Sequence, residues 1–225
     1  MELQVKSKDR VADHGEVLTP KHIVNAMLDL VKQETLRIDS RFLEPACGTG
    51  NFLIEILERK LKVVEKRYRK SQLEYERYSV LAVSSIYGID ILEDNAQECR
   101  KRLFEVFDTN YTNLFKKKTK NKCRDAVRYI LKRNIIHGNA LSLKTVGKNP
   151  QPIIFSEWSL VNGSLIKRRD FIFHELLPRP EVKQLSLFEK KTPHSSDLGE
   201  DIFIPEPAKE YPLVHFLEVA QAYEK

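Results

Sequence analysis

The segment FLEPACGTGNF, residues 42–52, constrains the fold of this chain more than any other feature. A short apolar strand runs into a turn with two glycines, Gly48 and Gly50, and apolar residues at helical spacing follow. Glycine lets the backbone turn sharply and approach a ligand closely. In open α/β sheets, ligands bind at the carboxyl ends of strands. The sequence therefore predicts a ligand site at this turn.

The rest of the chain alternates strand and helix patterns, which favours an α/β fold with a doubly wound, largely parallel sheet. The expected strands are residues 41–45, 80–91, 134–137, 153–158 and 171–173, although residues 75–84 could instead extend a helix. The expected helices are 19–31, a long one from about residue 51, 93–107, 126–132 and 213–223. Thr19 is the expected N-cap of the first helix, with Pro20 as its first residue.

The expected domain organisation is a single sheet domain with an appendage. Residues 1–177 form the domain, and a basic stretch at about 108–125 is expected to be a surface insertion. Residues 178–212 hold six of the ten prolines and are expected to form a linker before a C-terminal helix at 213–225.

Composition narrows the class of protein. The formal net charge of +6 suits a polyanionic partner, although many solvated surfaces carry such a charge. Cys47, Cys99 and Cys123 are widely separated, so neither a zinc site nor a disulfide framework is expected. The N-terminus has no apolar signal segment, and the longest apolar run, residues 80–91, is too short and polar to span a bilayer. These features predict a reduced, cytoplasmic protein that does not associate with membranes.

Polar residues at three predicted strand ends indicate what the site binds. Glu44 can accept hydrogen bonds from a cationic amino group, and Asp90 can accept both hydroxyls of a ribose. Asn139 follows the third strand, where its side chain could meet an adenine edge. A phosphate loop needs Lys and Ser/Thr after its last glycine, but Asn51 and Phe52 stand there. A sulfonium-bearing amino acid suits this site better than a nucleotide phosphate. Asp90 could alternatively cap the following helix.

Four motifs in order resemble those of a known family. HGEVLTP, EPACGTGNF, YGIDI and HGNAL, within residues 10–142, resemble the cofactor motifs of adenine-N6 DNA methyltransferases, including type I modification subunits. The resemblance implies a Rossmann-like class I methyltransferase fold, S-adenosylmethionine as cofactor, DNA as substrate, and a separate specificity or restriction subunit as partner. The cofactor-binding residues that it implies are Thr19, Pro20, Glu44, Ala46, Gly48, Gly50, Asp90, Ile91 and Asn139.

The resemblance also implies a role for each part of this set. Thr19 and Pro20 would hold the methionine end of the cofactor, and the residues of the glycine turn would line its amino acid part. Asp90 would bind the ribose, and Ile91 would pack on the adenine. Asn139 stands where the family usually has Asp accepting from the adenine amino group, and its amide oxygen can accept without charge.

The catalytic motif of the family is not recognisable in this sequence. The family places Asp/Asn/Ser-Pro-Pro-Tyr/Phe after the fourth strand, where it holds a flipped base. Ser156 and Trp158 stand at about that place and offer an acceptor and an aromatic ring without the prolines. Trp158 could instead be a packing residue, and NPQP at 149–152 a plain loop. The sequence has no Pro-Cys dipeptide, which argues against cytosine-C5 chemistry.

Three readings of function follow from these motifs. The first is an adenine-N6 DNA methyltransferase of a restriction–modification or mobile-element system. The second is a catalytically degenerate or accessory subunit that binds cofactor, DNA or a sliding clamp without transferring methyl groups alone. The third is methylation of RNA or protein.

Two further features predict partners. QLSLF at 184–188 resembles the peptide by which bacterial proteins bind the replicative sliding clamp. Its contact residues would be Gln184, Leu185, Leu187 and Phe188, although docking on the chain's own core is an alternative. Basic runs at 116–122 and 167–169 could contact phosphates or be solvated loops.

Overall fold

A mostly parallel sheet forms the centre of the computed structural model, which describes residues 8–14, 16–177, 194–195, 201–202 and 205–223. Strands β1 (Phe42–Glu44), β2 (Ile86–Asp90) and β3 (Ile135–Asn139) lie side by side in parallel, and β4 (Lys144–Thr145) adds to β3 antiparallel. All five residues of β2 are buried, which is typical of a strand covered on both faces.

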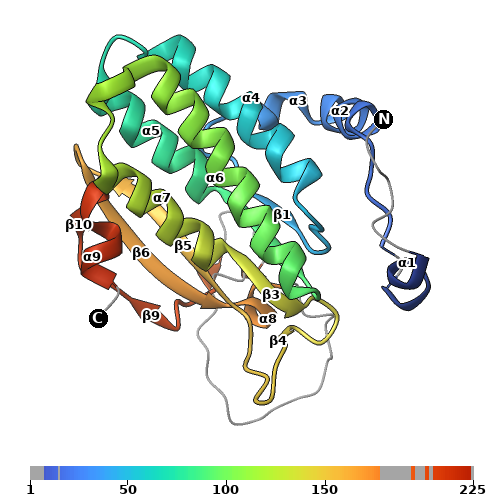
Figure 1. The fold of residues 1–225 in the computed structure, drawn as a ribbon. Helices are drawn as coiled ribbons and strands as arrows, with labels where there is room; N and C mark the ends of the chain where they lie inside the picture. The colour runs from blue at the N-terminus through green and yellow to red at the C-terminus, as the bar shows by residue number, and fades with distance from the viewer. Residues whose placement is uncertain (1–7, 15, 178–193, 196–200, 203–204, 224–225) are drawn as a thin grey trace.

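Four helices form one layer against this sheet (Figure 1). Helices α4 (Asn51–Tyr68) and α5 (Gln72–Ser84) connect β1 to β2, and α6 (Glu93–Phe115) and α7 (Asn121–Asn134) connect β2 to β3. The apolar stripe of α4 faces the sheet, with Leu53, Leu57, Leu61 and Val64 almost fully buried. Three shorter helices, α1 (Lys8–His14), α2 (Lys21–Leu30) and α3 (Lys32–Thr35), precede this layer.

An antiparallel hairpin crosses the other face of the sheet. Strands β5 (Ile154–Val161) and β6 (Leu165–Ile172) pair along their full length, and α8 (Phe173–Leu176) follows. Tyr87 of β2 packs on Phe155 and donates a hydrogen bond to the Ser156 carbonyl at 2.9 Å. The mixed α/β class is therefore confirmed. In the described ranges, however, four-residue α8 is the helix that packs into the cluster on this face, so a doubly wound sheet is not established.

The last part of the described chain packs on this hairpin. Strands β9 (Lys209–Glu210) and β10 (Val214–His215) pair with β6, and a 3-10 turn leads into α9 (Val219–Tyr223). The Arg168 guanidinium, 1% exposed, bonds Asp170 at 2.6 Å and lies 4.1 Å from the Tyr211 ring centre. The segment expected to be one helix from residue 213 is thus a strand, a turn and a short helix. Strands β7 (His194–Ser195) and β8 (Asp201–Ile202) pair with each other.

The local expectations have different outcomes. Residues 80–84 belong to α5 and not to a strand, as the helical alternative for residues 75–84 predicts. Residues 108–125 are not an insertion, because α6 and α7 continue through them and bury Tyr111 and Cys123 in the core. Pro20, and not Thr19, occupies the N-cap position of α2. None of the helices in the described ranges is long and apolar enough to cross a membrane.

Candidate functional site

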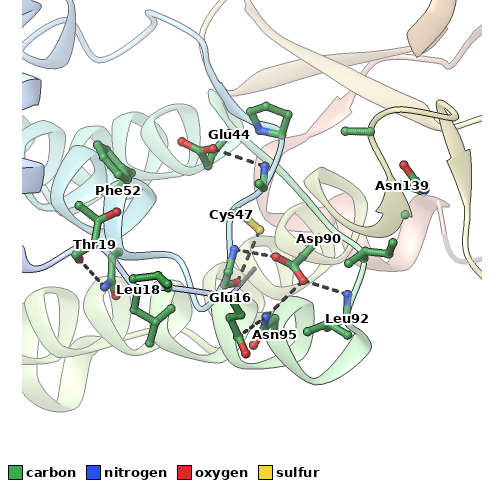
Figure 2. Close-up of a pocket in the computed structure, with 18 of the residues that line it drawn as sticks. Glu16, Leu18, Thr19, Glu44, Cys47, Phe52, Asp90, Leu92, Asn95 and Asn139 are labelled. Carbon is green, nitrogen blue, oxygen red and sulfur yellow. Dashed lines mark hydrogen bonds between the residues drawn. The ribbon is translucent and has the colours of Figure 1, made fainter. Parts of the chain in front are cut away.

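A cavity of about 400 Å³ lies at the carboxyl ends of β1, β2 and β3 (Figure 2). The structure brings Glu44, Asp90 and Asn139 together there, as the strand order requires. The residues that line it are Glu16, Val17, Leu18, Thr19, Glu44, Pro45, Ala46, Cys47, Gly48, Asn51, Phe52, Asp90, Ile91, Leu92, Asn95, Gly138, Asn139, Ala140 and Leu141.

The glycine turn, residues 46–50, contributes Ala46, Cys47 and Gly48 to the cavity lining. Gly48 and Gly50 have φ angles of +52° and +92°, in the left-handed region that favours glycine. A Cβ atom on Gly50 would lie only 2.7 Å from the Sγ atom of Cys99 on α6. Gly50 therefore does not line the cavity but allows α4 to start close against α6.

Asp90 holds the turn and the start of α6 together. Its Oδ2 atom accepts from the Gly48 amide at 2.7 Å, and its Oδ1 atom accepts from the Leu92 amide at 2.9 Å and from Asn95 Nδ2 at 3.3 Å. Leu92 is the N-cap residue of α6, so Asp90 satisfies a donor at the helix start while it also lines the cavity. The capping and ligand-binding interpretations of Asp90 are therefore compatible.

The charges around the cavity are acidic. Glu16, Glu44 and Asp90 line it, whereas none of the described lining residues is Lys, Arg or His. Burial raises the pKa of Glu44, and a hydrogen bond from the Ala46 amide at 3.4 Å partly opposes this shift. A cation beside Glu44 would favour its charged form. The cavity is therefore suited to a ligand with positive charge and not to a polyphosphate.

A strap of residues 16–19 closes one side of the cavity. The Glu16 carboxylate accepts from Asn95 Nδ2 at 2.7 Å and forms an ion pair with Arg10 of α1. Asn51 Nδ2 donates to the Thr19 carbonyl at 2.9 Å, which ties the strap to the first turn of α4. The sequence reasoning missed Glu16 and Asn95. The acid in HGEVLTP was the signal for Glu16, and no motif marks Asn95.

Asn139 and apolar side chains form the other side of the cavity. Asn139 Oδ1 accepts from the Leu141 and Ser142 amides, at 2.9 and 3.2 Å. Both lone pairs of this oxygen are thus used, so the amide NH₂ is its remaining polar group. The expectation that the oxygen serves a ligand does not fit this arrangement. Ile91 and Leu141 line the same cavity and are 45% and 95% exposed.

Cys47 lines the cavity but is poorly suited to be a nucleophile. Its thiol is buried, and the neighbouring Cys99 together with this burial raises its pKa. A thiol with a raised pKa carries little thiolate, which is the reactive form. Cys47 therefore serves packing beneath the turn.

The structure does not bring Ser156 and Trp158 to the cavity. Ser156 Oγ donates to Asp170 at 2.7 Å, and Trp158 Nε1 donates to Asn134 Oδ1 at 3.0 Å. Both residues are at most 4% exposed, so in this structure neither is accessible to a base. Pro20 also lies outside the cavity lining, where it begins α2.

Two predicted partner segments have different outcomes. In the run 167–169, Lys167 pairs with Glu210, Arg169 pairs with Glu157, and Arg168 is buried. This run is therefore not a free phosphate-binding surface. The peptide 184–188 lies outside the described residues.

Comparison with known proteins gives one family and one relative. The family model described as MmeI, DNA-methyltransferase domain, matches residues 21–151. The type II restriction enzyme and methyltransferase RM.BcgI of Heyndrickxia coagulans is 32% identical over 96 residues, which cover 43% of this chain and 12% of that protein. No solved structure matches the chain.

Proposed function

This chain belongs to the MmeI DNA-methyltransferase domain family, and on that premise we propose that it is an S-adenosylmethionine-dependent DNA methyltransferase that acts on adenine N6. The observation that carries the proposal is the acid-lined cavity where three parallel strands end. We further propose that the sheet and its helix layer are the first half of a Rossmann-like class I methyltransferase fold, with α4–α5 and α6–α7 as its crossovers.

The chemistry of the cavity fits this cofactor. S-adenosylmethionine has a sulfonium, an ammonium and one carboxylate, so it is a net cation, and it supplies an electrophilic methyl group. Glu44 would accept from the ammonium, and the uncharged turn would leave the cofactor carboxylate to backbone amides. A volume of about 400 Å³ is within the range of small-molecule sites.

The nucleoside part would occupy the region from Asp90 to Asn139. Asp90 Oδ1 accepts from two donors and Oδ2 from the Gly48 amide, so Oδ2 would accept from a ribose hydroxyl, which is the role of such carboxylates in dinucleotide folds. Ile91 and Leu141 offer apolar surface for the adenine ring. Thr19 and the strap would cover the methionine end, since they lie on the opposite side of the cavity from Asn139 (Figure 2).

A second function is favoured by the burial of Ser156 and Trp158. With these candidates in the interior, we propose as an alternative that the chain holds the cofactor while a specificity or restriction subunit completes the base-binding site. The RM.BcgI name joins restriction and methylation in one protein, and the match covers only a small part of it. The peptide with Leu187 and Phe188 is a further proposed contact, with a bacterial sliding clamp.

Calorimetry and radiolabelled methyl transfer separate these proposals. The chain should bind S-adenosylhomocysteine. Glu44→Gln should weaken the binding of S-adenosylmethionine more than Glu58→Gln does, which is a matched carboxamide change outside the cavity lining. Methyl transfer to unmethylated DNA by the chain alone favours the enzyme. Cofactor binding with transfer only in the presence of a partner favours the accessory role, and no cofactor binding by a folded chain contradicts both. A complex with the sliding clamp that survives Leu187→Ala and Phe188→Ala together would contradict the proposed clamp contact.

A further inference from the structure

Two helical hairpins, α4–α5 and α6–α7, turn at the end of the molecule remote from the cavity (Figure 1). Helix α6 starts beside the cavity and has 23 residues, so its far end is about 34 Å away at 1.5 Å per residue. The two turns touch, because Gln72 Nε2 donates to the Lys118 carbonyl at 2.7 Å and Lys120 pairs with Glu76 at 2.8 Å.

These turns carry a concentration of positive charge that we name the basic tip. It consists of Lys66, Arg69, Lys70 and Lys116–Lys118, and all six side chains are exposed. Within the described ranges no carboxylate pairs with any of them, whereas nearby Lys120 is paired. These six cations lie in two short stretches, residues 66–70 and 116–118, so positive charge is concentrated at this end of the molecule.

Helix ends explain only part of this pattern. Cations near a helix C-terminus are favoured by the helix dipole, which accounts for the basic residues in the last turn of α4. Lys116, however, has a φ of +51° and a ψ of −122°, a conformation in which glycine is less strained. The turn therefore keeps a cation at a position where backbone conformation alone would favour another residue.

We propose that the basic tip binds the phosphate backbone of duplex DNA, at a surface separate from the cavity. The choice of DNA as the polyanion rests on the proposed function, whereas the surface itself rests on exposure and charge. Flexible, exposed lysines contact phosphates without reading bases. The distance from the cavity, about 34 Å, is about one turn of B-DNA, so the tip would contact DNA well away from a base held at the cavity.

The proposal is tested by fluorescence anisotropy with a 30-base-pair unmethylated duplex between 50 and 200 mM KCl. The tip variant is Arg69→Glu with Lys117→Glu. The control variant is Lys32→Glu with Lys132→Glu, which changes two exposed cations elsewhere and alters net charge equally. The tip variant should bind DNA at least about tenfold more weakly at 100 mM salt, and the slope of log affinity against log salt should shrink by about 2, near 0.9 per lost phosphate contact.

The control variant should lose less than about threefold, because bulk charge at this salt is screened beyond about 10 Å. Equal losses in the two variants would overturn the proposal, since the effect would then be net charge alone. Binding of the wild-type chain to phosphatidylserine vesicles but not to the duplex would overturn it as well. Calorimetry with S-adenosylhomocysteine should give the same affinity for both variants, so a failure of the tip is distinguished from a failure of the cofactor site.

Discussion

Replacing Asp90 by Asn tests how one carboxylate supports both the fold and the site. Asn keeps the size of the side chain but replaces one acceptor oxygen with an NH₂ donor. Asp90 accepts on both oxygens, from the Gly48 amide at 2.7 Å and the Leu92 amide at 2.9 Å. The single oxygen of Asn can accept from only one of these two amides, so the other backbone N–H must face the NH₂ donor of Asn.

The magnitude of the loss follows from these contacts. A hydrogen bond to a charged group contributes about 1.5–3 kcal/mol, so Asp90→Asn should lower the free energy of unfolding by about 2 kcal/mol. In a chain of this size each kcal/mol shifts Tm by about 2–4 °C, which predicts a fall of about 4–8 °C. Asp125→Asn is the matched control, because Asp125 pairs with Arg128 on the exposed surface and should cost at most about 0.5 kcal/mol.

Thermal unfolding followed by circular dichroism, with and without S-adenosylhomocysteine, measures both effects. The wild-type chain should gain Tm with ligand, by the linkage of binding to folding, and Asp90→Asn should gain less. A variant with the wild-type Tm and the wild-type ligand shift would refute the reasoning. A lower Tm with an unchanged ligand shift would limit Asp90 to a structural role.

Three further predictions concern the turn, the strap and the core. Gly50→Ala should abolish ligand binding in calorimetry, and Cys99→Ala should restore only part of it, because the clash is relieved but the φ of +92° is not. Asn51→Asp should weaken ligand binding about tenfold, or about 1.4 kcal/mol, with little change in Tm, because it loses the bond to the Thr19 carbonyl. Burial lowers the pKa of Lys60 from 10.5 to about 7, so the unfolded state binds more protons between these values and stability rises with pH across that window. Between pH 7 and pH 9, the free energy of unfolding in urea should rise by about 2 kcal/mol more in the wild-type chain than in Lys60→Met. An equal rise in both chains would contradict the lowered pKa of Lys60.

The sequence predicts the convergence of Glu44, Asp90 and Asn139 because each stands at the end of a strand and parallel strands end at one edge. It does not predict Asn95, whose bond to Glu16 depends on how the strap folds back over α6. The sequence also leaves residues 80–84 ambiguous, since a short apolar run fits a strand or a buried helix equally well.

The burial of Ser156 and Trp158 depends on strand pairing that the local sequence does not encode. An acceptor and an aromatic ring after a strand are compatible with a catalytic site, but here the strand belongs to a hairpin. Its partner strand places Asp170 beside Ser156, and the end of α7 places Asn134 beside Trp158. Only the three-dimensional pairing shows that both side chains are buried in the interior.

The most direct test of the cofactor site is a crystal structure of the chain with S-adenosylhomocysteine. We expect the ligand in the cavity, with its ribose within hydrogen-bonding distance of Asp90 and the amino group of its homocysteine part beside Glu44. A folded chain whose cavity holds only solvent at a saturating ligand concentration, or whose ligand lies elsewhere, would contradict the account.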